Sequence, residues 1–294
     1  MKVDKFRTVI IYIIIILLGL VCLLPLLNIV AISFSSSAAV EGNMVGLIPV
    51  GFSTAAYEKI LEDSQFWHSF LISVERVVLT LIINFVLIVL MAYPLSKTNA
   101  QFRGRNIYAN LMIFAMLFNG GMIPTFLLVK SYGLLNTVWA LVLPGAVPIF
   151  NVILVMNFFA AVPKELEEAA FIDGANPFQV LTKIFIPISK PVLATVSLFS
   201  IVGSWNDFYS GLIYMSKAAY YPLMTYIQSL QINVEDLIKQ GNLSAVVDSA
   251  SLGNTNLNAA KIVIAVIPLL LIYPLLQRYF VSGIVVGSVK GYSC

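Results

Sequence analysis

The residues best placed to do chemistry lie in a polar stretch at 161–190, between two long apolar segments. Pro163 suits the first turn of a helix, where its missing N–H costs nothing, and acidic residues follow where the helix dipole favours carboxylates. Gly174 supplies a left-handed stop, Asn176 can cap a second short helix, and Pro187 is expected to end that helix. The acidic residues are Glu165, Glu167 and Glu168. The pattern predicts a helix–turn–helix, apolar on one side and acidic on the other, suited to docking into another protein.

A second group of functional candidates forms the string S-W-N-D-F-Y at 204–209, within an apolar segment. Asn206 and Asp207 can hydrogen-bond to hydroxyl groups, while Trp205 and Tyr209 offer aromatic faces. A carbohydrate presents polar edges and apolar faces, so these four residues form our candidate substrate pathway. The alternative is that they hold neighbouring helices together, as polar residues in membrane bundles do. The sequence favours neither interpretation over the other.

Two adjacent charges, Glu75 and Arg76, lie within another apolar segment. A charge at the centre of a bilayer costs at least about 2.5–3.5 kcal/mol. Adjacent residues on a helix do not face each other, so each charge needs its own partner. Either the two side chains reach water at the outer membrane surface, or they pair within the protein or line a pathway. Both interpretations stay open at the level of the sequence.

The composition indicates that the bilayer is part of the solvent of this chain. Its 294 residues are 60% hydrophobic and 11% charged, with a mean hydropathy of +0.94, whereas soluble domains contain about 25% charged residues. The net charge of +3 is too small to indicate nucleic-acid binding. The chain contains one histidine, His68, and two cysteines that lie far apart in the sequence, Cys22 and Cys294. These residues do not indicate a catalytic site, a metal site or a disulfide framework. The phosphate-binding pattern G-x-x-x-x-G-K-[ST] does not occur, so any ATP must be hydrolysed by another chain.

Six apolar segments are long enough to cross a bilayer as helices, which takes about 20 residues each. They are 9–32, 70–95, 107–129, 138–160, 192–214 and 261–281. The expected fold is therefore an all-α membrane protein with six transmembrane helices. Asn119, Gly120 and Gly121 could break the third of them. Lys and Arg concentrate on the side of the N-terminus, so both termini and the 161–190 loop are expected in the cytoplasm.

This topology divides the chain into three parts. Residues 1–69 would form the first helix and an external loop, residues 70–281 a core of five helices, and residues 282–294 a cytoplasmic tail. A further external segment at 215–260 is expected either to connect two helices or to cover the outer mouth.

The string at 168–187 resembles the EAA loop of bacterial ABC importer permeases. It reads E-A-A-F-I-D-G-A-N-P-F-Q-V-L-T-K-I-F-I-P, and the family pattern is E-A-A, three residues, G, nine residues, then I-x-L-P. The matching positions are Glu168, Ala169, Ala170, Gly174, Ile184 and Pro187; Ile186 stands where Leu is usual. The resemblance implies a type I importer permease whose loop docks in a cleft of a separate ATPase. It assigns this coupling to Glu167, Glu168, Ala169, Ala170, Asp173 and Gly174.

Other stretches are similar to the maltose-type carbohydrate permeases in particular. A-Y-P-L-S-K at 92–97 resembles the A-Y-x-L-S-[KR] of that group, and a W-N-x-F string recurs in its fifth helix. Residues 120–130 and 133–145 resemble the second permease of complex-oligosaccharide importers, including alginate-type systems. The tail at 277–291 is similar to the ending F-V-x-G-[IL]-x-x-G-[AS]-V-K-G. The likeness extends over 71–291, most of the chain.

The resemblance also implies a set of partners and a location. An importer of this kind contains a homologous second permease, two ATPase subunits that bind ATP and Mg, and an external solute-binding protein, all in the bacterial inner membrane or beside it. This chain would bind no cofactor and perform no catalysis, and its substrate would be an oligosaccharide. The alternatives are an importer permease for a non-sugar solute and a stand-alone secondary transporter, which would leave the EAA-like loop unexplained. A polytopic membrane enzyme is disfavoured by the single His68.

Overall fold

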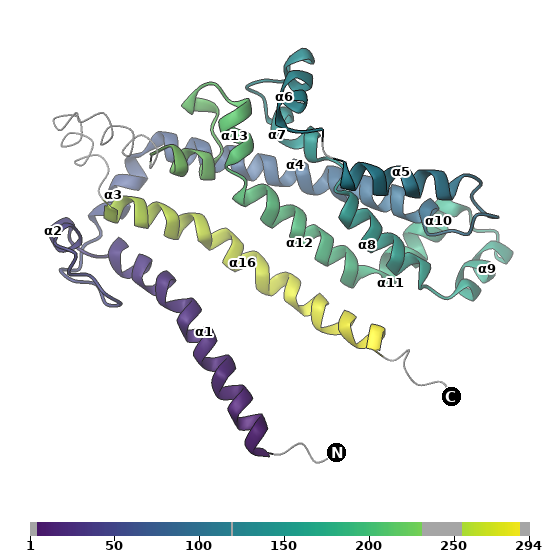
Figure 1. Ribbon diagram of the computed structural model, residues 1–294, viewed down its shortest axis with the longest axis horizontal. Helices are drawn as coiled ribbons and strands as arrows, with labels where there is room; N and C mark the ends of the chain where they lie inside the picture. The colour runs from purple at the N-terminus through teal and green to yellow at the C-terminus, as the bar shows by residue number, and fades with distance from the viewer. Residues whose placement is uncertain (1–4, 119, 231–254, 289–294) are drawn as a thin grey trace. The chain divides into compact units, whose positions relative to one another are not determined.

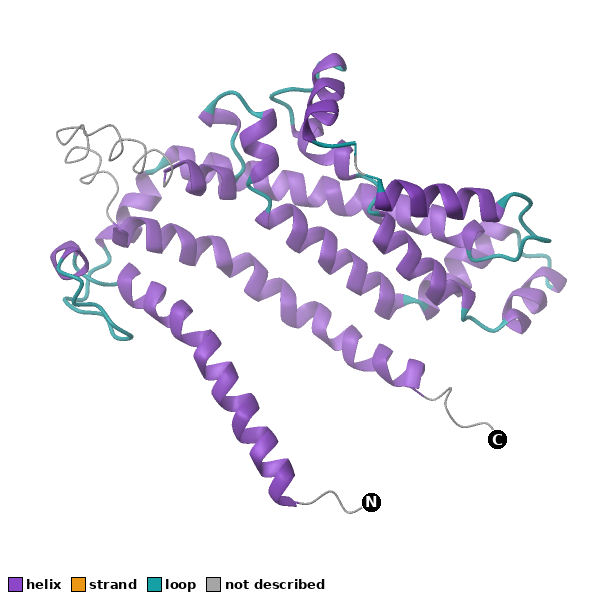
Figure 2. Ribbon diagram, viewed as in Figure 1, coloured by secondary structure: helices purple, strands orange, loops and turns teal. Residues whose placement is uncertain are grey.

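The computed structural model describes residues 5–118, 120–230 and 255–288, and the side chains of 8–118, 120–230 and 255–274. Every regular element in these ranges is helical (Figures 1 and 2). The elements are α1 (Lys5–Ser33), α2 (Ser37–Glu41), α3 (Ala55–Glu62), α4 (Ser64–Leu95), α5 (Arg105–Leu117), α6 (Met122–Ser131), α7 (Val138–Val142), η1 (Leu143–Gly145), α8 (Ile149–Ala160), α9 (Lys164–Ile172), α10 (Pro177–Val180), η2 (Leu181–Phe185), α11 (Ile186–Ile188), α12 (Lys190–Asn206), α13 (Tyr209–Tyr214), η3 (Ala218–Tyr220) and α16 (Thr255–Ser288). Much of the expected external segment at 215–260 and the end of the expected tail at 282–294 lie outside the described residues.

The chain forms two compact units. The first is drawn from Met1–His68 and Tyr226–Pro268, and the second from Ser69–Thr225 and Leu269–Cys294. The first unit thus combines the N-terminal part, expected at 1–69, with a later segment of the chain.

Three described helices are long and apolar enough to cross a membrane by themselves. They are Thr8–Ser33, Ser64–Leu95 and Thr255–Pro274. Every residue from 9 to 27 in α1 is exposed, although nearly all of them are apolar. A helix that is hydrophobic all round and uncovered by its own chain is suited to contact with lipid or with another membrane protein.

Three bent helix pairs bring the candidate spans among the described residues to as many as six, when each pair is counted as one span. Three of the expected spans, at 107–129, 138–160 and 192–214, are interrupted; the sequence allows a break in the first of them, whereas the other two are expected to be continuous and are corrected here. In the first, α5 ends at Leu117 and α6 begins at Met122 with an inclination of 110°, and Gly121 has a φ of 88°. This is the break that the two glycines indicated; Asn119 lies outside the described residues.

The other interruptions also have local causes. The segment α7–η1 meets α8 at 48° because Pro148 precedes α8 and cannot continue a helix from η1. Helix α12 ends at Asn206, and Asp207 is extended there, with a ψ of 100°. The Asp207 carboxylate accepts a hydrogen bond from the Ser210 N–H. This bond caps the N-terminal end of α13, which therefore begins here as a new short helix.

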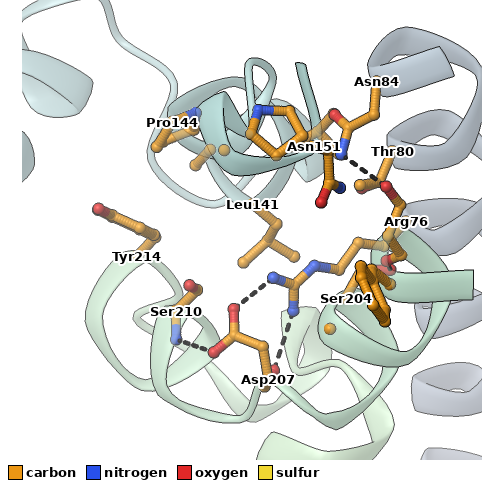
Figure 3. A pocket seen from close by; sticks show the side chains of 17 residues that line it. Arg76, Thr80, Asn84, Leu141, Pro144, Asn151, Ser204, Asp207, Ser210 and Tyr214 are labelled. Atoms are coloured by element: carbon orange, nitrogen blue, oxygen red, sulfur yellow. Dashed lines mark hydrogen bonds and ion pairs between the residues drawn. The ribbon is translucent and has the colours of Figure 1, made fainter. Parts of the chain in front are cut away.

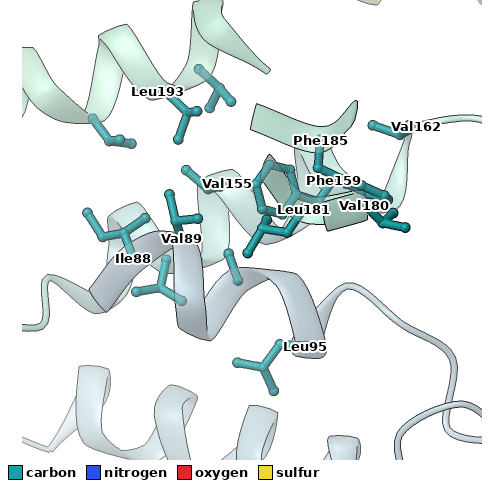
Figure 4. Close-up of a cluster of buried hydrophobic side chains, with 14 of the residues drawn as sticks. Ile88, Val89, Leu95, Val155, Phe159, Val162, Val180, Leu181, Phe185 and Leu193 are labelled. Carbon is teal, nitrogen blue, oxygen red and sulfur yellow. The ribbon is translucent and has the colours of Figure 1, made fainter. Parts of the chain in front are cut away.

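The main core of the second unit joins the later half of α4 to α8, α12 and the segment α10–η2 (Figure 4). Ile88 and Leu95 enter it from α4, Val155 and Phe159 from α8, and Phe185 from η2. The Phe159 and Phe185 rings meet edge to face with centroids 5.4 Å apart. The segment that follows the predicted turn at Gly174 is therefore packed firmly onto the helix bundle.

In the first unit, one carboxylate connects three segments. Asp63 Oδ1 caps α4 by accepting from the Phe66 N–H at 3.0 Å, while Oδ2 accepts from Lys261 Nζ at 2.7 Å and from the Tyr226 hydroxyl at 2.9 Å. Burial raises the pKa of Asp63, but these hydrogen bonds outweigh it and hold the pKa below its ordinary value of 3.8. The Lys261 side chain is 4% exposed, and its ion pair with Asp63 offsets the cost of burying the ammonium group.

Candidate functional site

A stripe of polar side chains follows one face of α4. Arg76, Thr80 and Asn84 are spaced by four residues and therefore lie one above another. They are 3%, 8% and 4% exposed, and Ser73 continues the stripe toward the start of the helix. Buried polar groups are costly in a membrane protein unless they meet partners or a cavity. This face of α4 is consequently a candidate site.

The stripe faces a cavity of about 260 Å³ in the second unit (Figure 3). Hydroxyl, amide and charged groups line part of it, and apolar side chains line the rest. The polar lining residues are Arg76, Thr80, Asn84, Asn151, Ser200, Ser204, Asp207 and Ser210; the apolar and aromatic ones include Leu141, Val142, Pro144, Phe199 and Tyr214. Four parts of the chain build this site: α4, the break between α7 and α8, α12, and α13.

Arg76 crosses the site to Asp207. Its Nη1 donates to the Asp207 main-chain oxygen at 2.9 Å, and its Nη2 donates to the Asp207 carboxylate. Asp207 Oδ1 accepts in addition from the Ser210 N–H at 3.1 Å. Arg76 is thus paired inside the protein rather than extended to the membrane surface, whereas Glu75 next to it is exposed.

The four predicted pathway residues take different positions, and Asp207 is the one that lines the cavity. Trp205 is 5% exposed, and its ring meets Phe70 edge to face at 5.7 Å. Asn206 is exposed and donates from its side chain to the Val202 carbonyl at 3.0 Å. Tyr209 is 54% exposed, with its hydroxyl 2.9 Å from the sulfur of Met122 on α6. The structure therefore does not gather these four residues around one cavity.

Sequence reasoning missed most of the cavity lining. Thr80, Asn84, Asn151 and Ser200 were not singled out, although the Asn84 and Ser200 side chains form a buried hydrogen bond at 3.2 Å. The available signal was the repeat of polar residues at intervals of four along an otherwise apolar span. That signal identifies a polar face of α4 but not the partners that come from other helices.

The loop between α8 and α12 adopts the predicted helix–turn–helix. Helix α9 starts at Lys164, just after Pro163, and Gly174 reverses the chain with a φ of 78°. Asn176 and Gln179 then form a reciprocal capping box, with hydrogen bonds of 2.8 and 2.9 Å. Local sequence signals therefore account for both helix ends at this turn.

The second helix ends at Ile188, one residue after Pro187, the residue predicted to end it. Helix continues through α10, η2 and α11 to Ile188, and it meets α12 at 83°. The segment η2, just before Pro187, is a π-helical turn. A wider turn at this point leaves room for the Pro187 ring, whose nitrogen has no N–H to donate, so the helix runs one residue further, to Ile188.

The predicted coupling residues differ in their surroundings. Glu167 is 8% exposed, and both of its carboxylate oxygens accept from Lys97 Nζ at 2.7 Å. The same ammonium group lies over the rings of Tyr93 and Phe185, at 4.1 and 4.3 Å from their centroids. Ala170 is partly buried against the core. The remaining predicted residues, Glu168, Ala169, Asp173 and Gly174, are exposed.

Apolar side chains are also uncovered around this turn. Phe171 is 43% exposed, Ile172 87% and Phe178 66%. With the exposed Glu168 and Asp173 beside them, they form a projecting surface of mixed apolar and acidic character, which we call the loop surface. Exposed apolar clusters rimmed by polar residues are typical of protein–protein contacts.

Long apolar helices, a polar cavity among them and a projecting helix–turn–helix together define a membrane transport permease. The chain belongs to the family described as the binding-protein-dependent transport system inner membrane component, whose model matches residues 2–286.

Curated relatives support this membership over nearly the whole chain. The chain is 41% identical to protein LplC of Bacillus subtilis, over 93% of this chain and 91% of that protein. It is 39% identical to the polygalacturonan/rhamnogalacturonan transport system permease protein YtcP of Bacillus subtilis, over 98% and 99%. Among solved structures, it is similar to a chain of a bacterial ABC transporter involved in the import of the acidic polysaccharide alginate. That match has a TM-score of 0.83 and 32% identity, and it covers 95% of this chain and 98% of the other.

Proposed function

We propose that this chain is one of the two permease subunits of a bacterial ABC importer that moves oligosaccharides, including acidic ones, into the cytoplasm. The observation that carries the proposal is the cavity beside α4. Its hydroxyl, amide and charged groups suit the polar edge of a sugar, and Leu141, Pro144 and Phe199 suit the apolar face. Two similar proteins are named for the transport of polygalacturonan or rhamnogalacturonan and of alginate, which supports the same substrate class.

Coupling to ATP hydrolysis is assigned in this proposal to the loop surface. Its exposed Ile172 and Phe178 offer apolar contacts to an ATPase subunit, and Glu168 offers a carboxylate for a basic partner residue. Glu167 has another role, because it holds α9 against Lys97. A separate ATPase would bind ATP and Mg, and an external binding protein would deliver the sugar.

Uptake by the assembled importer tests the proposed function. The chain would be purified with its ATPase, partner permease and binding protein, and reconstituted into liposomes that contain ATP. We expect ATP-dependent accumulation of an oligosaccharide, with liposomes that contain ADP as the control. Accumulation of an amino acid or a peptide in place of sugars would favour the non-sugar alternative, and accumulation without the ATPase would indicate a secondary transporter.

The topology is tested separately by labelling single cysteines in sealed cells. Cys22 and Cys294 would first be replaced by serine. We expect a cysteine at the exposed position of Lys59 to react with an impermeant reagent from outside, and one at the exposed position of Gly174 to react only after lysis. External labelling at position 174 would contradict the cytoplasmic assignment of the loop surface.

A further inference from the structure

Arg76 retains hydrogen-bonding capacity that the described part of its chain does not use. A guanidinium carries five N–H donors in a rigid planar fork. Nη1 and Nη2 both donate to Asp207, while Nε is buried without a hydrogen-bond partner in the described part of the chain. One turn further along α4, the hydroxyl oxygen of Thr80 is also buried and has no hydrogen-bond partner in the described part of the chain. Both residues line the cavity.

Such groups are unfavourable unless water or a ligand in the cavity provides the missing partner. A buried donor left without an acceptor costs about 1–3 kcal/mol, and native structures contain few of them. The Arg76 side chain is 4% exposed, so bulk water does not compensate its free edge. An oxygen-rich ligand in the cavity would remove this cost, and a carboxylate would do so best because it can accept two parallel N–H bonds from the fork.

Asp207 is held in a way that allows it to give up Arg76. Its Oδ1 is bonded to the Ser210 N–H at the start of α13, so of the two carboxylate oxygens Oδ2 alone accepts from Arg76; the other bond from the guanidinium goes to the Asp207 main-chain oxygen. Its side chain is 28% exposed, against 4% for Arg76. Asp207 would therefore keep one hydrogen bond and partial hydration if another carboxylate took its place on Arg76.

We propose that Arg76 recognises the carboxylate of a uronic-acid unit, and that Asp207 is the counterion that Arg76 carries in the absence of sugar. This inference rests on the proposed function and narrows its substrate class to acidic oligosaccharides. The cavity of about 260 Å³ is smaller than the roughly 300–1,000 Å³ typical of pockets for drug-sized ligands. It therefore accommodates one sugar unit of the chain at a time, beside Thr80 and Asn84.

A purely structural ion pair predicts a different pattern of mutant effects. Removing either partner of a buried pair leaves the other uncompensated, so the two single variants should be damaged in similar ways. Recognition by Arg76 predicts opposite effects instead. Loss of the guanidinium removes the sugar contact, whereas loss of the Asp207 charge removes a competitor for it.

The test measures KM and kcat for ATP-driven uptake by the reconstituted importer, with a uronic-acid oligomer and a neutral oligosaccharide of equal length. For Arg76→Gln we expect KM for the acidic oligomer to rise about tenfold or more, as loss of one charge-assisted pair implies. For Asp207→Asn we expect KM for the acidic oligomer to fall or stay unchanged. The KM for the neutral oligosaccharide should change about equally in Arg76→Gln and Asp207→Asn. Glu75→Gln, on the exposed side of α4, is the matched control and should behave as wild type.

Equal losses in Arg76→Gln and Asp207→Asn, for both sugars, would overturn the recognition role and leave a structural pair. If Arg76→Gln does not assemble, Arg76→Lys takes its place; it keeps the charge but loses the fork, so we expect a raised KM for the acidic oligomer alone. An unchanged KM in Arg76→Lys would also overturn the inference. A wild-type importer that transports neither oligomer would instead contradict the proposed function.

Discussion

Lys97 Nζ lies 2.7 Å from both carboxylate oxygens of Glu167, and this contact ties the first turn of α9 to the end of α4. Arg76, a buried charge on α4 itself, lies 21 residues earlier in the chain. At 1.5 Å per residue, the helix from Arg76 to Leu95 covers roughly 30 Å, about the thickness of the hydrocarbon core. One helix thus carries the candidate sugar site around its middle, and the anchor of the candidate coupling loop lies just past its end at Leu95.

We expect Glu167→Gln to weaken the engagement of the ATPase by the loop without unfolding the chain. The side chains of Lys97 and Glu167 are 12% and 11% exposed, so loss of their charge-assisted bonds should cost roughly 1–3 kcal/mol. Sugar-stimulated ATP hydrolysis and uptake should fall together by several-fold, while the chain still inserts in the membrane. Glu165→Gln, exposed on the same helix, is the control. A double variant with Lys97→Met should be less impaired than the two single losses combined; strict additivity would show that the pair is not coupled.

Gly174 should tolerate only residues that accept a left-handed backbone. Its φ is 78°, and a Cβ at this position would meet nothing within 4 Å, so any defect must come from the backbone rather than from crowding. Left-handed geometry costs about 1–2 kcal/mol for most residues and less for Asn. We expect the amount of copurifying ATPase to be highest for Gly174→Asn, lower for Gly174→Ala and lowest for Gly174→Val. Equal retention in all three variants would separate this turn from docking.

Glu168→Ala should weaken docking while leaving the loop folded, because Ala has the best helix propensity and Glu168 is exposed. Loss of one hydrogen bond to a charged group corresponds to roughly ten- to a hundred-fold in affinity. The affinity of the permease pair for its ATPase, measured in detergent or nanodiscs, should decrease by that factor. Wild-type affinity in Glu168→Ala would assign the contact to the apolar part of the loop surface instead.

The contact of Asp63 with Lys261 should make the first unit sensitive to acid. The pKa of Asp63 is lowered in the folded protein, so this carboxylate stabilises the fold above its ordinary pKa of 3.8. That stabilisation is lost as the pH falls below 3.8 through the lowered value. At neutral pH, Asp63→Asn should lower the melting temperature by several degrees, because it leaves Lys261 buried without its counterion. The further change Lys261→Met should restore part of the loss, and Glu62→Gln, exposed one residue earlier, should have little effect.

Gly211 should not accept a side chain. A Cβ there would lie 2.1 Å from the hydroxyl oxygen and 2.8 Å from the Cβ of Thr225, so Gly211→Ala forces α13 away from residue 225. Overpacking of this kind typically costs about 1–3 kcal/mol. We expect a lower melting temperature and weaker uptake, with only partial rescue by Thr225→Ala, since the Cβ clash remains. Gly19→Ala, where α1 has open space, is the control. A fully stable Gly211→Ala would show that this contact is not tightly packed.

Much of the fold could be predicted because its signals are local. Apolar runs of sufficient length identify the spans, and the glycines after Asn119 anticipate the break between α5 and α6. The turn at Gly174 and the cap at Asn176 depend on residues within three or four positions of each other, so their residue types alone predict the helix–turn–helix. The end predicted at Pro187 is shifted by one residue, to Ile188, because the preceding turn is widened into a π-helical segment.

The pairings of the charged residues depended on tertiary structure. Arg76 and Asp207 are 131 residues apart in the chain, and Lys97 and Glu167 are 70 apart. A charge within an apolar span shows that a partner is needed, but many polar groups elsewhere in the chain can serve. Helix packing decides which of them lies within hydrogen-bonding distance, and it also placed Thr80 and Asn84 around a cavity while excluding Trp205 and Asn206 from its lining. Residue types and spacing therefore determined the membrane class and the loop, whereas the packing of α4 against α12 and α13 determined the site.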